Sequence, residues 1–248
     1  MTASTFKVKA TIAALKNVAT FMALVEKLRS RHPHLPGIGV FSGPSGFGKT
    51  YAAIYAQNKT RALRVEVGDS WSKKTFLRHV LAEAGVEGRG TIADMAEQAI
   101  MVLGDDPDRP LIIDEADKLV DKGNIEIARE LQEMTKVPML LIGEEQLPFK
   151  LKKFERVDNR VLDWRYAEPC DIEDTRTLAE LICPDLGIAD DLIDAIRGRS
   201  AGRARRIVVN LTKVEEYARN TGTASIDLAA YSGGFFTGDA PSRARRAG

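Results

Sequence analysis

The 248-residue chain has little cysteine, few aromatic residues, no long apolar run and almost no net charge. Its two cysteines, Cys170 and Cys183, are too few for a disulfide framework and are expected to be small buried residues. No apolar run approaches the roughly 20 residues needed to cross a membrane, and no charged-then-apolar leader opens the chain. We therefore expect no membrane partner and a reducing, cytoplasmic setting.

The formal net charge of +1 argues against a chain that coats nucleic acid with a uniformly basic surface. Basic residues nevertheless gather locally, because seven lie between residues 197 and 219 and three more, Arg243, Arg245 and Arg246, lie near the end. Local basic faces of this kind can bind phosphate even when the total charge is near zero. No cysteine and histidine spacing indicates a zinc site.

Short apolar strands alternate with helices of period 3.6 as far as residue 168. This alternation predicts an α/β domain over residues 1–168, with a parallel sheet covered by helices and a loose arm at 1–15. Residues 169–222 predict a small domain of three helices with no strand between them. Residues 223–248, rich in Gly, Ser and Ala, predict a flexible basic tail. The expected strands are 38–41, 63–67, 110–113, 137–142 and 161–166.

One segment after the first strand matches the pattern G-x-x-x-x-G-K-[ST] without a departure: Gly43, Pro44, Ser45, Gly46, Phe47, Gly48, Lys49 and Thr50. The glycines let successive backbone N–H groups point at phosphate oxygens, and the following helix adds its positive end. Lys49 is expected to reach the β- and γ-phosphates, and the Thr50 hydroxyl to hold Mg²⁺. The segment therefore predicts a P-loop that binds ATP.

An apolar strand, residues 111–113, ends in Asp114 and Glu115. Asp114 is expected to hold Mg²⁺, and Glu115 to act as the general base that polarises the attacking water. A glutamate beside the magnesium aspartate favours hydrolysis of a nucleoside triphosphate over transfer to a small molecule. Asp117, two residues further on, is expected to cap the following segment.

The order of P-loop, acid pair, a strand ending in Ile142-Gly143, an arginine-bearing segment and a helical lid resembles the AAA+ ATPases. Four stretches, GPSGFGKTYAA, LIIDEADKL, ELQEMTKVP leading to LLIGEEQL, and SAGRARRIVVNL, further resemble the Mu B family of phage transposition ATPases. That resemblance covers residues 15–220. It implies an ATPase that binds double-stranded DNA without sequence preference, forms ATP-dependent rings or filaments, and stimulates a transposase in the bacterial cytoplasm.

The resemblance also implies roles for several arginines. Arg160, or else Arg156, would be the finger that completes the site of a neighbouring subunit. Arg205, or else Arg206, would be the lid arginine that folds over the nucleotide. A polar residue that senses the γ-phosphate is expected after the fourth strand, where this chain has Glu144; Gln146 could take that role.

A basic stretch after the second strand is the expected DNA contact. Lys73, Lys74 and Arg78 lie at helical spacing there and could bind backbone phosphates, while Trp71 could stack or pack. Two other functions stay open: a helicase loader or initiator of the AAA+ type, and a nucleotide-gated protein scaffold with little turnover.

Overall fold

A computed structural model describes residues 15–239, so most of the expected N-terminal arm and the last nine residues, with Arg243, Arg245 and Arg246, lie outside the described residues. The chain divides into two compact units. We refer to Lys16–Glu168 as the α/β unit and to the part from Pro169 onward as the helical unit. No helix among the described residues is long and apolar enough to cross a membrane.

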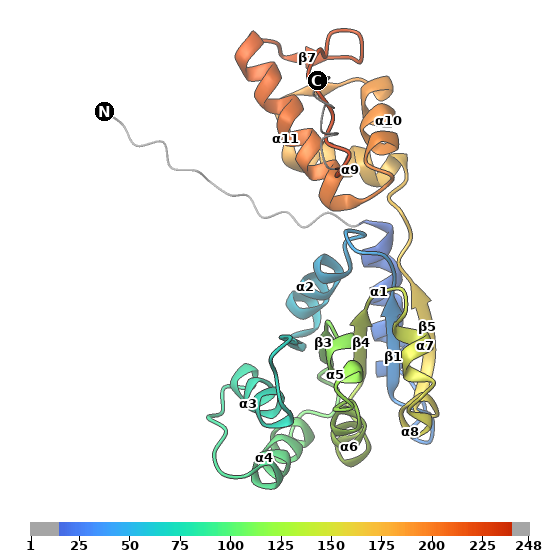
Figure 1. Ribbon diagram of the computed structural model, residues 1–248, viewed down its shortest axis with the longest axis vertical. Coiled ribbons are helices and arrows are strands. Elements are labelled where there is room, and N and C mark those ends of the chain that lie inside the picture. The colour runs from blue at the N-terminus through green and yellow to red at the C-terminus, as the bar shows by residue number, and fades with distance from the viewer. Residues whose placement is uncertain (1–14, 240–248) are drawn as a thin grey trace, which may run out of the picture. The chain divides into compact units, whose positions relative to one another are not determined.

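The α/β unit is built on a five-stranded sheet with the order β2-β3-β4-β1-β5 (Figure 1). Every neighbouring pair of strands is parallel, which confirms the predicted sheet. The central strands are buried at every position and carry a polar side chain only at their last residues, Ser42 of β1 and Asp114 of β3, as expected for a sheet with both faces covered. The strands are β1 (Ile38–Ser42), β2 (Leu63–Glu66), β3 (Leu111–Asp114), β4 (Met139–Gly143) and β5 (Val161–Tyr166).

Helices cover both faces of this sheet (Figure 1). On one face, Gly39 lies against α1 (Lys16–Arg29), since a Cβ there would meet Leu28 at 2.8 Å. Its neighbours along the strand, Ile38 and Val40, point the other way into the larger core. That core is covered by α3 (Lys73–Glu83), α4 (Ile92–Gly104), α5 (Asp117–Asp121), α6 (Glu126–Thr135), α7 (Leu147–Leu151) and α8 (Glu155–Asp158). Helix α2 (Lys49–Thr60) packs beside α1.

The sheet order positions the candidate site. Strand β4 lies between β1 and β3, with Ser42 opposite Gly143 and Ile113 opposite Leu141. Because parallel strands end at the same edge, the loops that follow β1, β3 and β4 all begin at that edge. The P-loop, the acid pair and Glu144 are therefore brought together by topology.

The helical unit contains α9 (Ile172–Ile182), α10 (Asp190–Arg199) and α11 (Ala204–Thr221). The expectation of no strand between these helices is wrong. Two-residue strands β6 (Gly187–Ile188) and β7 (Ser225–Ile226) form a parallel pair, and β6 lies between α9 and α10. Strands this short carry no periodicity that a sequence pattern could reveal.

Residues 225–239 also depart from the expected flexible tail, because they pack along α11. The buried Asn210 side chain accepts the Phe236 N–H at 2.7 Å and donates to the Phe236 carbonyl at 3.0 Å. The rings of Tyr217 and Tyr231 meet edge to face at 5.2 Å. These contacts connect positions far apart in the sequence, so composition alone does not reveal them.

Candidate nucleotide-binding site

The P-loop leaves β1 at Ser42 and enters α2 at Lys49. Gly46 and Gly48 have φ of 86° and 83°, in the left-handed region that favours glycine. No described side chain caps the start of α2 at Gly48, so no capping oxygen neutralises the positive end of this helix. The backbone therefore offers an anion site of the kind that phosphate binds.

Lys49 lies across the P-loop, with its ammonium donating to the carbonyls of Gly43 at 2.6 Å and Pro44 at 3.0 Å. Burial lowers the pKa of Lys49 below its ordinary value, while nearby carboxylates act to raise it. In order of strength these are Glu115, Asp114, Glu144 and Asp117. Thus the lysine and the acids that the sequence pattern singled out lie close together in the α/β unit.

Asp114 is the most enclosed acid of the site, with 1% of its surface exposed. Burial raises the pKa of Asp114 above its ordinary value, and a hydrogen bond from the Thr50 side chain and the charge of Arg64 oppose that rise. The Arg64 guanidinium contacts the Asp114 carboxylate at 3.0 Å. The other carboxylate oxygen of Asp114 accepts the N–H of Glu115 at 3.1 Å.

Arg64 is a residue of this site that the sequence analysis missed. It lies on β2, two residues before Glu66, which pairs with Asp114 across the parallel ladder. Arg64 and Glu66 alternate with buried residues along β2, and their side chains contact each other at 3.3 Å. Two charged residues on one face of an otherwise apolar strand are the signal that could have indicated a polar partner for Asp114.

Thr50 and Asp114 fit the magnesium ion that a P-loop site implies. Their hydroxyl and carboxylate oxygens are the hard ligands that Mg²⁺ prefers, and the two side chains are already hydrogen bonded to each other. No group of three or more His, Cys, Asp or Glu able to hold a metal occurs in the described part of the chain. The ion would therefore take its remaining ligands from nucleotide and water.

Glu115 has an unusual backbone conformation, with φ of 58°, which side-chain-bearing residues seldom adopt. Burial raises the pKa of the Glu115 carboxyl, and the charge of Lys118 opposes this rise. The Lys118 ammonium lies 3.7 Å from a carboxylate oxygen of Glu115 and 3.7 Å from one of Asp69. Asp69 belongs to the loop before α3. Strain of this kind is typical of residues whose position matters for function.

Asp117 does not cap the following helix, contrary to the expectation. Its carboxylate accepts the N–H of Glu144 at 2.6 Å, and α5 has no side-chain cap. Asp117 therefore connects the acid pair to the end of β4. Glu144 has an exposed side chain, and Gln146, also exposed, precedes α7.

The two candidate finger arginines have different surroundings. Arg160 makes an ion pair with Glu133 at 2.6 Å, so its charge already has a partner within the chain. Arg156 lies on α8 and is exposed, and its side chain makes no hydrogen bond or ion pair with any residue between 15 and 239. Of the two, Arg156 is the one free to reach another molecule.

The candidate DNA-binding residues lie on α3. Ser72 caps this helix as expected, by accepting the N–H of Thr75 at 3.2 Å. Lys74 and Arg78 are exposed, Lys73 is half-buried, and none of the three has an ion-pair partner among the described residues. The Trp71 ring stacks on His79 with centroids 3.9 Å apart and lies over Gly68, so it packs within the protein.

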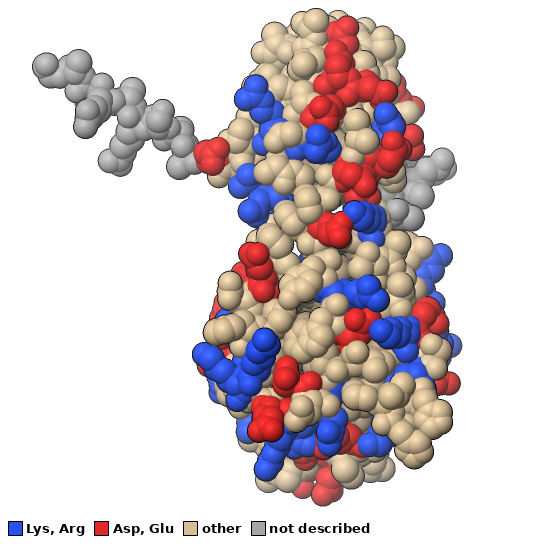
Figure 2. All heavy atoms as spheres, turned by 90° about the vertical axis from the view of Figure 1, so that its right-hand side faces the viewer, with Lys and Arg blue, Asp and Glu red and all other residues tan. Residues whose placement is uncertain are grey.

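On the face shown in Figure 2, Lys and Arg are interspersed with Asp and Glu in both units. Within the α/β unit, α3 lies toward the opposite side in Figure 1, at the β2 edge of the sheet. Lys74 and Arg78 of α3 are exposed and have no ion-pair partner among the described residues, so they are able to bind phosphate.

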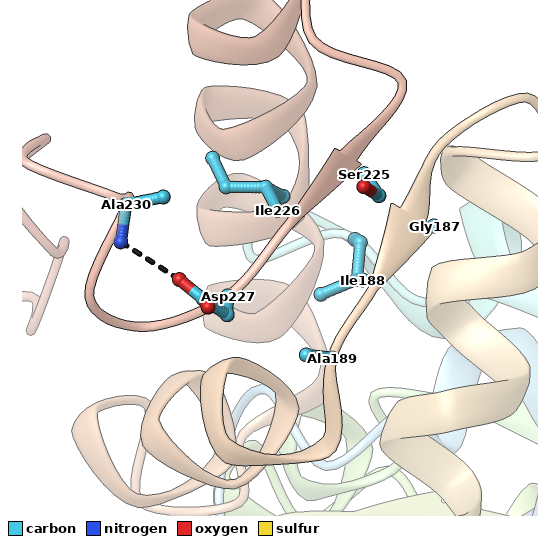
Figure 3. Close-up of a pocket in the computed structure, with 7 residues that line it drawn as sticks. All are labelled: Gly187, Ile188, Ala189, Ser225, Ile226, Asp227 and Ala230. Carbon is cyan, nitrogen blue, oxygen red and sulfur yellow. Dashed lines mark hydrogen bonds between the residues drawn. The ribbon is translucent and has the colours of Figure 1, made fainter.

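The helical unit holds the candidate lid arginines at the start of α11. Arg205 is exposed, whereas Arg206 is half-buried with its guanidinium against Gly238. A shallow pocket of about 420 Å³ in the same unit is lined by residues of the paired strands β6 and β7 and of the segments that follow them (Figure 3). Its one charged lining residue, Asp227, accepts the N–H of Ala230 at 2.8 Å.

Comparison with known proteins identifies the domain that carries the site. Residues 31–151, from just after α1 to the end of α7, match the AAA domain. This match contains the P-loop, the acid pair and α3. No curated protein matches the chain.

Solved structures share the fold at low sequence identity. The Orc1 protein of Aeropyrum pernix in complex with DNA is 17% identical, with a TM-score of 0.63 over 87% of this chain and 63% of that chain. Cdc6p of Pyrobaculum aerophilum is 14% identical, with a TM-score of 0.63 over 90% of this chain and 66% of that chain. The Thermotoga maritima RuvB Holliday junction branch migration motor is 17% identical, with a TM-score of 0.59 over 88% of this chain and 67% of that chain. The chain thus spans less than two thirds of the first two proteins.

Proposed function

We propose that the chain is a P-loop ATP hydrolase, as the match of residues 31–151 to the AAA domain indicates, and that ATP controls its assembly on double-stranded DNA. The observation that carries the proposal is the occurrence in one unit of the P-loop with its nearby acids and of cations on α3 that have no ion-pair partner among the described residues. Each subunit would contribute few phosphate contacts and bind DNA weakly alone. Assembly would align many such sites along one duplex and raise the avidity.

The residues of the site divide the hydrolytic reaction among them. Lys49 and the N–H groups at the start of α2 bind the phosphates, and Thr50 with Asp114 holds Mg²⁺, which neutralises phosphate charge when bound. Glu115 accepts a proton from water as the water oxygen forms a bond to the γ-phosphorus. The bond from that phosphorus to the β–γ bridging oxygen breaks, and ADP and phosphate leave.

Arg156 supports the proposal that a second copy of the chain completes the site. An exposed arginine without a partner can enter a neighbouring P-loop site and stabilise charge on the transferring phosphoryl group. Arg160 stays the second candidate, at the cost of its ion pair with Glu133. Arg205 of the helical unit is proposed to fold over the nucleotide.

The proposed process is DNA transposition, in which the assembled ATPase would mark target DNA and stimulate a transposase. This is supported by the four sequence stretches that resemble the Mu B family. A second candidate, an initiator-type ATPase, is favoured by the fold shared with Orc1, a protein solved in complex with DNA. Stimulation of DNA strand transfer by a transposase would support the first, and binding to a replicative helicase would support the second.

The DNA proposal is tested by measuring binding to duplexes of random sequence across a salt series. The measurement is made with a non-hydrolysable ATP analogue and with ADP. We expect tight binding only with the ATP analogue, weakening steeply as salt rises. Replacing both Lys73 and Lys74 by Ala should flatten the slope of log affinity against log salt by roughly 0.9 for each phosphate that is no longer neutralised. ATP affinity should not change.

The exposed pair Lys152 and Lys153, replaced by Ala together, is the charge-matched control and should keep the wild-type slope. Equal, salt-insensitive binding in ATP and ADP would contradict the proposal. Intact ATP binding with no DNA binding at all would instead favour a nucleotide-gated protein scaffold.

A further inference from the structure

One buried amide connects the P-loop to the segment that leads into the helical unit. Asn17, the second residue of α1, has 5% of its surface exposed. Its Nδ2 donates to the Phe47 carbonyl at 2.8 Å and to the Glu168 carbonyl at 2.7 Å, while its Oδ1 accepts the Glu168 N–H at 2.9 Å. Both amide protons and the oxygen are thus used, which fixes the orientation of the side chain.

The bond to Phe47 acts on a peptide group of the P-loop itself. The Phe47 carbonyl and the Gly48 N–H belong to one planar trans peptide, so they point in opposite directions. By holding the carbonyl, Asn17 turns the Gly48 N–H away from α1. Gly48 directly precedes the first helical residue, Lys49, where the loop N–H groups are expected to meet phosphate.

The bonds to Glu168 act on the connection between the two units. Glu168 is followed by Pro169, at which the helical unit begins. The residue before it, Ala167, extends the β1–β5 ladder by donating to the Ser42 carbonyl at 2.8 Å. A Cβ at Gly43 would lie 3.0 Å from Ala167, so the connecting segment also runs beside the start of the P-loop.

We propose that Asn17 is a positioning residue that orients the Phe47–Gly48 peptide toward phosphate and transmits nucleotide binding to the connecting segment at Glu168. A nucleotide that holds the Gly48 N–H also holds the Phe47 carbonyl, because one peptide plane carries both. The shared amide then restrains Glu168, since a fully bonded buried amide has no alternative partner. The exposed ion pair of Lys16 with Glu168 would add little to this restraint. The proposal rests on the proposed binding of ATP by the P-loop.

This proposal is tested by measuring hydrogen exchange of the whole chain. The measurement is made with and without a saturating magnesium complex of a non-hydrolysable ATP analogue. In the wild type, nucleotide should slow amide exchange in residues 43–50 and 165–172 by about tenfold or more. In Asn17→Asp, which keeps the acceptor but loses both donors, analogue affinity should fall by about tenfold. At saturation residues 43–50 should still be protected, while residues 165–172 should exchange at the same rate with and without nucleotide.

Asn210→Asp is the matched control, because Asn210 is a buried amide that holds both backbone groups of Phe236 in the helical unit. It should keep the wild-type nucleotide response in both segments. If Asn17→Asp does not fold, Asn17→Ser is the milder variant, since its shorter side chain cannot span Phe47 and Glu168 together.

If Asn17 has a purely structural role, Asn17→Asp should speed amide exchange by the same factor with and without nucleotide. The ratio of the exchange rates without and with nucleotide would then equal the wild-type ratio in residues 165–172, and this result would overturn the proposal. A wild type that binds the analogue without protection of residues 165–172 would overturn it as well. A wild type that does not bind the analogue would instead refute the proposed function.

Discussion

At the scale of single residues, the site combines groups that local sequence patterns reveal with groups that they do not. Lys49, Thr50, Asp114 and Glu115 could be singled out because a P-loop motif and an acid pair after a strand have a recognisable spacing, and the structure brings these residues together. Arg64, Asn17 and Lys118 could not, because each contacts a residue that is distant along the chain: Asp114, Phe47 and Asp69 respectively. Their identification needed the strand register and the burial pattern.

Glu115 gives the most direct prediction at this scale. Glu115→Gln should still bind ATP but hydrolyse it about 10²–10⁴-fold more slowly, because the amide cannot accept the proton of the attacking water. Steady-state phosphate release and analogue binding measure the two effects separately. Glu145→Gln, a change at an exposed acid after β4, should leave both near the wild-type values. Normal turnover by Glu115→Gln would mean that another group is the base.

At the scale of elements, the strands and long helices could be predicted because each carries a continuous apolar or periodic pattern. The short helices α5, α7 and α8 could not, because one turn contains too few residues to show a period. Their placement matters, since α5 begins at Asp117, which holds the backbone at Glu144. The two-residue strands of the helical unit were missed for the same reason.

The junction of β4 with α5 gives the prediction at this scale. A Cβ at Gly143 would lie 2.0 Å from an Asp117 carboxylate oxygen and 2.7 Å from the Leu147 side chain. Gly143→Ala should therefore destabilise the protein by about 1–3 kcal/mol, as overpacking in a well-packed region does.

Gly104→Ala is the matched control, because nothing lies within 4 Å of its added Cβ. At the end of α4 it should be neutral or stabilise by up to about 1 kcal/mol. Denaturant unfolding measures both, and a neutral Gly143→Ala would mean that Asp117 moves freely.

At the scale of the whole molecule, the two buried cysteines report on the folded state of the helical unit. Burial raises the pKa of the Cys170 and Cys183 thiols from 9.0 to about 12. A folded pKa above the unfolded one stabilises the fold below pH 9, and this contribution is lost as pH rises from about 9 to about 12. Stability should therefore fall across that range, and replacing both cysteines by Ala should flatten the fall.

The same thiols should react slowly with a thiol reagent in the native protein at pH 8, at a rate set by opening of the unit. Fast reaction of both thiols without denaturant would contradict the burial on which this prediction rests. Measured alkaline stability of the wild type and the double variant gives an independent check.

Assembly is the property that decides whether the ATP site works within one chain or between two. If Arg156 acts in a neighbouring site, Arg156→Ala should bind ATP normally yet hydrolyse it about 10³-fold more slowly. Lys49→Ala should not bind ATP, because the phosphates lose their main cationic partner. Mixing the two inactive variants should restore part of the activity, since some interfaces then join an intact P-loop from one subunit to an intact Arg156 from the other.

Arg160→Ala, which removes an arginine already paired with Glu133, should lower turnover far less and serves as the control. If Arg156→Ala regains no activity on mixing with Lys49→Ala, Arg156 does not act in a neighbouring site, and nucleotide binding must control DNA by a route other than this arginine.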